Sequence, residues 1–72
     1  MNSKDREMIV VELDDGTLVA NARVINGLAC DLYAAIQTYK EHDYMGSASL
    51  AKKAHYAMFN ALDEIGYFDK EI

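Results

Sequence analysis

The chain has 72 residues, with 12 acidic and 7 basic side chains and a formal net charge of −5. This length suits a single small domain, and a hydrophobic share of 51% favours a folded chain over a disordered one. The acidic balance argues against direct binding to a nucleic-acid backbone, because such binding needs clustered lysine and arginine.

Cys30 is the only cysteine, so the chain cannot form an internal disulfide, and we expect a cytoplasmic protein. No apolar run approaches the ~20 residues that a membrane-spanning helix needs. The sequence contains no proline, no internal repeat and no low-complexity tract. We therefore expect a flexible tail over residues 1–7 and a single domain over residues 8–72.

The first predicted element is a β-hairpin over residues 8–25. Valine and isoleucine are dense in this stretch, and Asp14, Asp15 and Gly16 separate two apolar runs. The two aspartates suit the right-handed positions of a type I turn, and the glycine suits the left-handed position that ends it. The expected cross-strand pairs are Leu13 with Thr17, Val11 with Val19, Val10 with Ala20, and Ile9 with Asn21.

In that register both faces of the ribbon are mostly apolar. An isolated two-stranded ribbon is only marginally stable in water and has two strand edges to protect. Pairing of one strand with the same strand of a second copy would hide an edge, and symmetric dimers are the commonest assemblies of this kind. We therefore expect a homodimer.

A second interpretation of residues 17–41 is one long helix. Apolar residues there recur at alternating spacings of four and three, which is a heptad stripe. Gly27 and several β-branched residues oppose a helix, since glycine alone costs about 1 kcal/mol in a helix interior. The hairpin is the favoured interpretation. The stripe consists of Leu18, Ala22, Ile25, Ala29, Leu32, Ile36 and Tyr39.

A first helix is predicted over residues 28–42, with Asn26 as its N-cap and Gly46 as a stop. A second is predicted over residues 47–65, capped by Ser47 or Ser49. Gly66 suits the left-handed position after its end, where Tyr67 would touch Leu62. A short loop makes the helices antiparallel. The expected fold is α+β, an N-terminal β-hairpin packed on two antiparallel helices (ββαα), and the alternative is an all-α helical hairpin dimer.

The second helix has two apolar sides. Its core face is predicted to contain Leu50, Ala51, Ala54, Met58, Ala61, Leu62 and Ile65. Tyr56 and Phe59 fall on the other side and are neighbours at a spacing of three. Three interpretations remain open: the rings pack inside the domain, they form an interface with another chain, or they are isolated exposed aromatics.

Acidic side chains gather around the hairpin turn and around the C-terminus, and such surfaces orient and accelerate binding to basic partners. One candidate partner is a nucleic-acid-binding enzyme with a basic groove. The predicted partner-binding residues are Tyr56, Phe59, Lys52, Asp63, Glu12, Asp14 and Asp15.

Catalytic or metal chemistry has little support in the sequence. Cys30 is expected in the first turns of the first helix, where a thiol can become reactive, but no oriented base is adjacent. His42 and His55 match no zinc spacing; the first suits a helix C-terminus and the second the border of the core. We therefore predict no catalytic residues, no cofactor and no metal.

The predicted function is that of a non-enzymatic protein-binding module, an inhibitor or adaptor of the kind encoded by phage or mobile elements. Such a protein acts by occluding a surface of its partner. The alternative is a small redox- or metal-linked protein that uses Cys30 and the two histidines.

Overall fold

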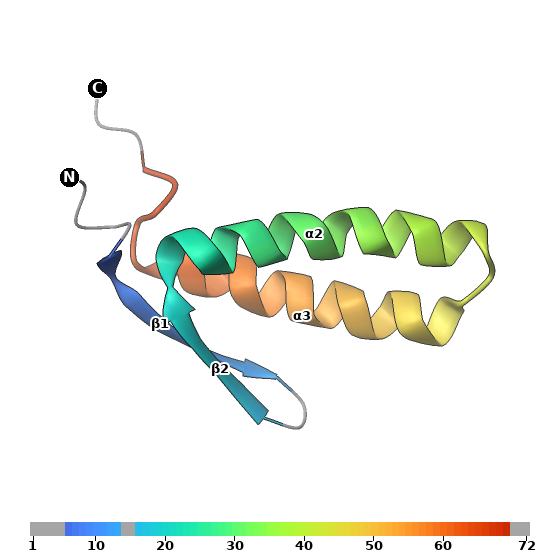
Figure 1. Cartoon of the computed structure of the whole chain (residues 1–72), viewed down its shortest axis with the longest axis horizontal. Helices are drawn as coiled ribbons and strands as arrows, with labels where there is room; N and C mark the ends of the chain where they lie inside the picture. The colour runs from blue at the N-terminus through green and yellow to red at the C-terminus, as the bar shows by residue number, and fades with distance from the viewer. Residues whose placement is uncertain (1–5, 14–15, 70–72) are drawn as a thin grey trace.

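The computed structural model describes residues 6–13 and 16–69. Two antiparallel strands are followed by two helices, which confirms the predicted α+β fold of ββαα order (Figure 1). The strands are β1 (Met8–Leu13) and β2 (Gly16–Asn21), and the helices are α2 (Ala22–Glu41) and α3 (Met45–Glu64).

The two helices lie side by side and antiparallel, and the hairpin crosses one end of the pair (Figure 1). That end is where α2 begins and α3 finishes, while the loop between the helices lies at the opposite end. β1 has its main helical contact with α3. Among the described residues, no helix is long and apolar enough to cross a membrane.

The hairpin forms in a register one residue away from the expected one. Leu13 pairs with Gly16, so this glycine is the first residue of β2 instead of the end of the turn. The predicted turn positions of Asp14 and Asp15 lie outside the described residues. The observed pairs are Met8 with Asn21, Ile9 with Ala20, Val10 with Val19, Val11 with Leu18, Glu12 with Thr17, and Leu13 with Gly16.

The observed register separates the two faces of the ribbon, because side chains alternate along a strand. Ile9 and Val11 are buried against the helices, whereas Met8, Val10 and Val19 are exposed on the outer face. Burial of one face fixes a register strongly, since a slip of one residue would turn every side chain of a strand over. The expected pairing of Val11 with Val19 would have placed a buried and an exposed side chain on the same face of the ribbon.

Helix α2 begins at Ala22, six residues before the predicted start, and the hairpin ends at Asn21 instead of residue 25. The side chain of Asn21 caps the helix, because its Oδ1 accepts a hydrogen bond from the Val24 N–H at 2.9 Å. Asn26, the predicted cap, lies inside the helix. From Ala22 onward the heptad interpretation was therefore correct, and burial of Ala22 and Ile25 offsets the cost of an interior glycine.

Helix α3 begins at Met45, ahead of the predicted Ser47 or Ser49 cap, so Gly46 lies inside it and does not end α2. The connection between the helices depends instead on Asp43, which has a φ of 63°. Aspartate is one of the few side chains that tolerate this left-handed conformation. Tyr44 occupies the N-cap position without a side-chain hydrogen bond to the helix.

The C-terminal end of α3 confirms the sequence interpretation. Ile65 is the C-cap and Gly66 has a φ of 75°. The Gly66 N–H bonds to the Asp63 carbonyl at 3.0 Å, and the Tyr67 N–H bonds to the Leu62 carbonyl at 3.0 Å. These two bonds define a Schellman ending, and Tyr67 packs against the core as such endings require.

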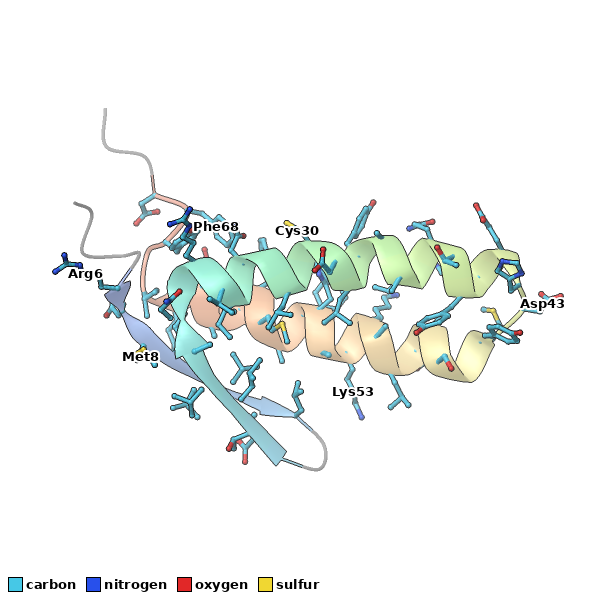
Figure 2. All side chains as sticks on the ribbon, in the orientation of Figure 1. Arg6, Met8, Cys30, Asp43, Lys53 and Phe68 are labelled. Carbon is cyan, nitrogen blue, oxygen red and sulfur yellow. The ribbon has the colours of Figure 1, made fainter. Side chains whose placement is uncertain are left out.

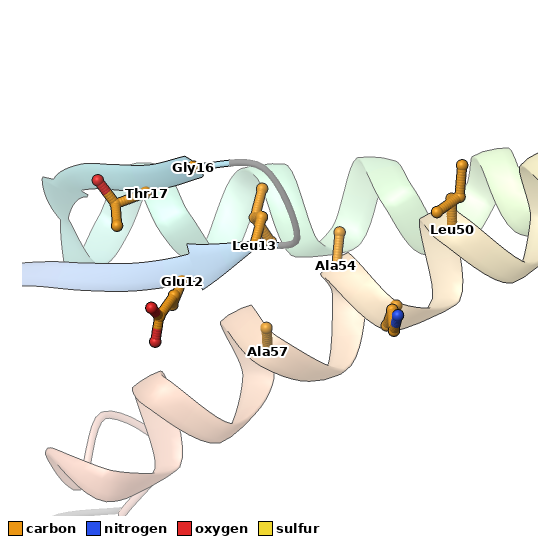
Figure 3. Close-up of a pocket in the computed structure, with 8 residues that line it drawn as sticks. Glu12, Leu13, Gly16, Thr17, Leu50, Ala54 and Ala57 are labelled. Atoms are coloured by element: carbon orange, nitrogen blue, oxygen red, sulfur yellow. The ribbon is translucent and has the colours of Figure 1, made fainter.

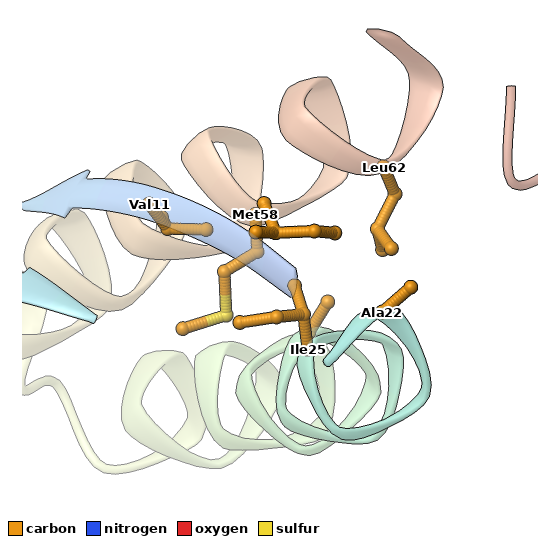
Figure 4. Packing of buried hydrophobic residues seen from close by; sticks show 7 residues of the cluster. Val11, Ala22, Ile25, Met58 and Leu62 are labelled. Atoms are coloured by element: carbon orange, nitrogen blue, oxygen red, sulfur yellow. The ribbon is translucent and has the colours of Figure 1, made fainter. Parts of the chain in front are cut away.

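The core lies where the hairpin crosses the helices (Figure 4). Ile25, Leu62 and Val11 are its largest fully buried side chains, one each from α2, α3 and β1. Leu50 was predicted on the core face, but its side chain is 62% exposed. The buried cluster consists of Ile9, Val11, Ala22, Ile25, Ala29, Met58 and Leu62.

Candidate functional site

Five aromatic side chains cover one side of the helix pair. Tyr33 comes from α2, His55, Tyr56 and Phe59 come from α3, and Phe68 comes from the segment after α3. We call these five residues the aromatic surface. The exposed fraction is 58% for Tyr33, 52% for Tyr56, 42% for Phe59 and 36% for Phe68.

The five rings contact one another in an unbroken network. His55 is its centre, with ring centroids 5.8 Å from Tyr33, 5.6 Å from Tyr56 and 6.3 Å from Phe59. Phe68 stacks on the other side of Phe59 at 5.0 Å. A stacked pair of phenylalanines such as Phe59 and Phe68 is worth about 0.5–1.5 kcal/mol beyond area burial. The rings therefore form one continuous surface, not a set of scattered exposed side chains.

His55 anchors this network to the backbone of α2. Its Nδ1 lies 2.8 Å from the carbonyl oxygen of Ala29, and since a carbonyl only accepts, the proton resides on Nδ1. The half-buried imidazole confirms the expectation that His55 borders the core. The bond also links the two helices directly beneath the exposed rings.

A shallow apolar hollow of about 260 Å³ lies between the helices on this side. Phe59 and Phe68 line it, and Cys30 and Tyr33 line it from α2 (Figure 2 shows Cys30 and Phe68 on the same side of the molecule). The remaining lining residues are Asn26, Ala29 and His55.

A larger groove of about 610 Å³ lies on the opposite side of α3, between this helix and the paired ends of β1 and β2 at Leu13 and Gly16 (Figure 3). The residues that α3 contributes to this groove include two small apolar side chains, Ala54 and Ala57. Glu12 and Lys53 bring charges of opposite sign to it. The other lining residues are Leu13, Gly16, Thr17 and Leu50.

The structure divides the predicted partner-binding residues between these two sides. Tyr56 and Phe59 are exposed in the aromatic surface, so the interpretation that placed them inside the domain is wrong. Lys52 and Asp63 are exposed and belong by helical position to the same side of α3. Glu12 lies at the hairpin groove and does not join them. Asp14 and Asp15 lie outside the described residues.

Cys30 does not occupy the first turns of a helix, because α2 begins at Ala22. The thiol is exposed in the hollow, and the argument from a helix N-terminus no longer applies to it. His42 is the C-cap of α2, at the end of the molecule away from the hollow, as its predicted role at a helix C-terminus requires. Within residues 6–13 and 16–69, no three His, Cys, Asp or Glu side chains gather closely enough to hold a metal ion.

Sequence reasoning missed Tyr33 and Phe68. The signal for Tyr33 was its spacing of three from Cys30 and of seven from Asn26, which puts these residues along one side of a helix that begins early enough. The signal for Phe68 was weaker. Only the Schellman ending at Gly66, which turns the chain back, brings its ring onto Phe59.

Comparisons of this chain with protein-family models, with curated proteins and with solved structures find no match in any of the three.

Proposed function

We propose that this chain is a non-enzymatic protein-binding module, which uses the aromatic surface to cover part of a partner protein. The observation that carries the proposal is the unbroken network of half-exposed rings on one side of a small domain. Aromatic side chains are enriched in interface cores and supply most of the interfacial hot spots.

The network prepares the surface for binding. Each ring is already restrained by a neighbouring ring, and His55 is fixed by its bond to Ala29. Binding therefore immobilises few additional side-chain rotamers, which cost about 0.5–1.5 kcal/mol each when they are free before association. The hollow beside Phe59 accommodates a side chain of the partner, and the exposed charges of Lys52 and Asp63 provide a polar rim.

The charge of the chain favours a basic partner. With a net charge of −5, the protein attracts basic surfaces over a range set by ionic strength. Glu12 lies on the other side of α3 from the rings, so the acidic hairpin contributes to encounter and orientation, not to the aromatic contact. An inhibitor or adaptor that blocks the basic groove of a nucleic-acid-binding enzyme, as phage and mobile elements encode, fits this combination.

The test is capture of partners from a cell extract by the wild-type chain and by the variant Tyr56→Ala, Phe59→Ala. We expect the variant to remain folded by circular dichroism and to lose the captured proteins. Tyr44→Ala is the matched control, because Tyr44 is 60% exposed at the loop between the helices and lies outside the aromatic surface. Equal capture by the double variant and the wild type would refute the proposal.

A further inference from the structure

Four residues form a symmetric stripe along the exposed side of α3. Lys52, Tyr56, Phe59 and Asp63 follow one another at spacings of four, three and four, and all four are exposed. At about 100° per residue they fall within an arc of about 60° of the helix circumference. The stripe has a centre of symmetry midway between Ala57 and Met58, because the two charged residues are equally far from it and so are the two rings.

This symmetry makes the stripe complementary to itself. A second copy rotated by 180° about an axis through that centre, perpendicular to α3, lies antiparallel to the first. Lys52 then faces Asp63 of the second copy, and Tyr56 faces Phe59 of the second copy. Every contact occurs twice, as a twofold interface requires. In a parallel arrangement each charge would instead meet its own kind.

We propose that two copies of this chain associate through α3 in this antiparallel arrangement, with two Lys52–Asp63 ion pairs flanking a centre of four rings. Antiparallel packing also places the positive end of each helix dipole beside the negative end of the other. The rings are held in place before association, since Phe59 stacks between His55 and Phe68 and Tyr56 contacts His55.

The inference rests on the proposed function, because both use the aromatic surface. The second copy is then the first occupant of that surface, and any other protein partner must displace it. Partner binding should therefore weaken as the concentration of the chain rises. The stripe is small compared with standard interfaces, which bury about 1,200–2,000 Å², so we expect a dimer in micromolar equilibrium with its monomer.

The hairpin offers the other surface on which copies could meet. Its outer face exposes Met8, Val10 and Val19, and its strand edges could pair with those of a second copy. Association through this face would involve neither Lys52 nor Asp63, which both belong to α3. Association through the hairpin is thus a distinct outcome that the experiment separates from the proposal.

The test is the dissociation constant of the dimer, measured by sedimentation equilibrium on the whole chain. Lys52→Glu and Asp63→Lys should each raise this constant about tenfold, because each places like charges opposite one another twice. The combined variant Lys52→Glu, Asp63→Lys should restore it, since the pairs are re-formed with exchanged signs. Lys53→Glu and Glu64→Lys are the matched controls: they make the same changes of charge on adjacent residues of α3 outside the stripe.

A monomer throughout the micromolar range would overturn the proposal. So would a dimer that Lys52→Glu leaves intact, which would indicate association through the hairpin, or a combined variant that fails to re-form the dimer. These outcomes are separate from the fate of the proposed function. If the wild type is monomeric but captures partners through Tyr56 and Phe59, the proposed function stands and the dimer does not. If the chain forms the charge-dependent dimer but captures no partner, the dimer stands and the proposed function does not.

Discussion

The two flanks of α3 show how this small domain divides its apolar side chains. The flank that faces β1 carries Ala54, Ala57 and Ala61, all partly buried. The opposite flank carries Tyr56 and Phe59, which remain half-exposed. On these two flanks the small alanines are therefore partly covered, whereas the large rings are half-exposed.

The reason is the distance at which a strand can pack on a helix. Alanine methyl groups leave room for β1 to approach α3, and Ile9 and Val11 of the strand then fill the space with their own side chains. Rings on that flank would hold the strand away. On these two flanks of α3, side-chain size thus indicates where the domain closes on itself and where its surface stays uncovered.

The largest expected loss of stability comes from removing side-chain volume where the hairpin and both helices meet. Leu62 is fully buried, so Leu62→Ala should lower the free energy of unfolding by about 3 kcal/mol. Leu50→Ala is the control on the same helix: its side chain is 62% exposed, and its effect should stay below about 0.5 kcal/mol. Urea unfolding measures both, and equal effects would show that the hairpin does not define the core.

A smaller effect follows from adding volume on the covered flank. Ala61 packs against the buried cluster, so Ala61→Leu should cost about 2 kcal/mol by pushing β1 away from α3. Ala34→Leu on the exposed side of α2 should change stability by less than about 0.5 kcal/mol. Thermal unfolding followed by circular dichroism compares the two, and a neutral Ala61→Leu would contradict the close approach of strand and helix.

The smallest expected effect comes from the turn at Gly66, after the end of α3. This turn places Tyr67 against the core and the ring of Phe68 on Phe59. Its φ of 75° disfavours any side chain, and a Cβ there would lie 3.0 Å from Asp69 Oδ2. Gly66→Ala should therefore cost about 1 kcal/mol. Gly27→Ala should do the opposite and stabilise by about 0.5–1 kcal/mol, because a methyl group added at Gly27, inside α2, would have open space around it. If both variants moved the urea midpoint in the same direction, the contrast between a left-handed Gly66 and a helical Gly27 would be refuted.

The order and type of the elements were predictable, but their boundaries near the hairpin were not. The end of α3 was correctly predicted because a glycine with left-handed φ followed by an apolar residue is a local pattern. The start of α2 was wrong because two asparagines, Asn21 and Asn26, both suit an N-cap. The choice between them depends on burying Ala22 and Ile25 under the hairpin, which no local pattern reveals.

The candidate site was predictable to a similar extent. Tyr56 and Phe59 followed from helical spacing on α3 alone. Whether they were surface or core depended on which flank the hairpin covers, and the acidic residues of the hairpin could not be placed relative to them. Tyr33 and Phe68 joined the surface only through contacts between segments distant in the sequence, by way of His55 and the turn at Gly66.

By itself the sequence determined what depends on neighbours along the chain: two strands, two helices, the Schellman ending and the symmetric stripe on α3. The tertiary structure alone decided the strand register, the start of α2 and the side of the helix pair that is left uncovered. These features depend on which surfaces are buried together, and burial is a property of packed elements that no single segment possesses.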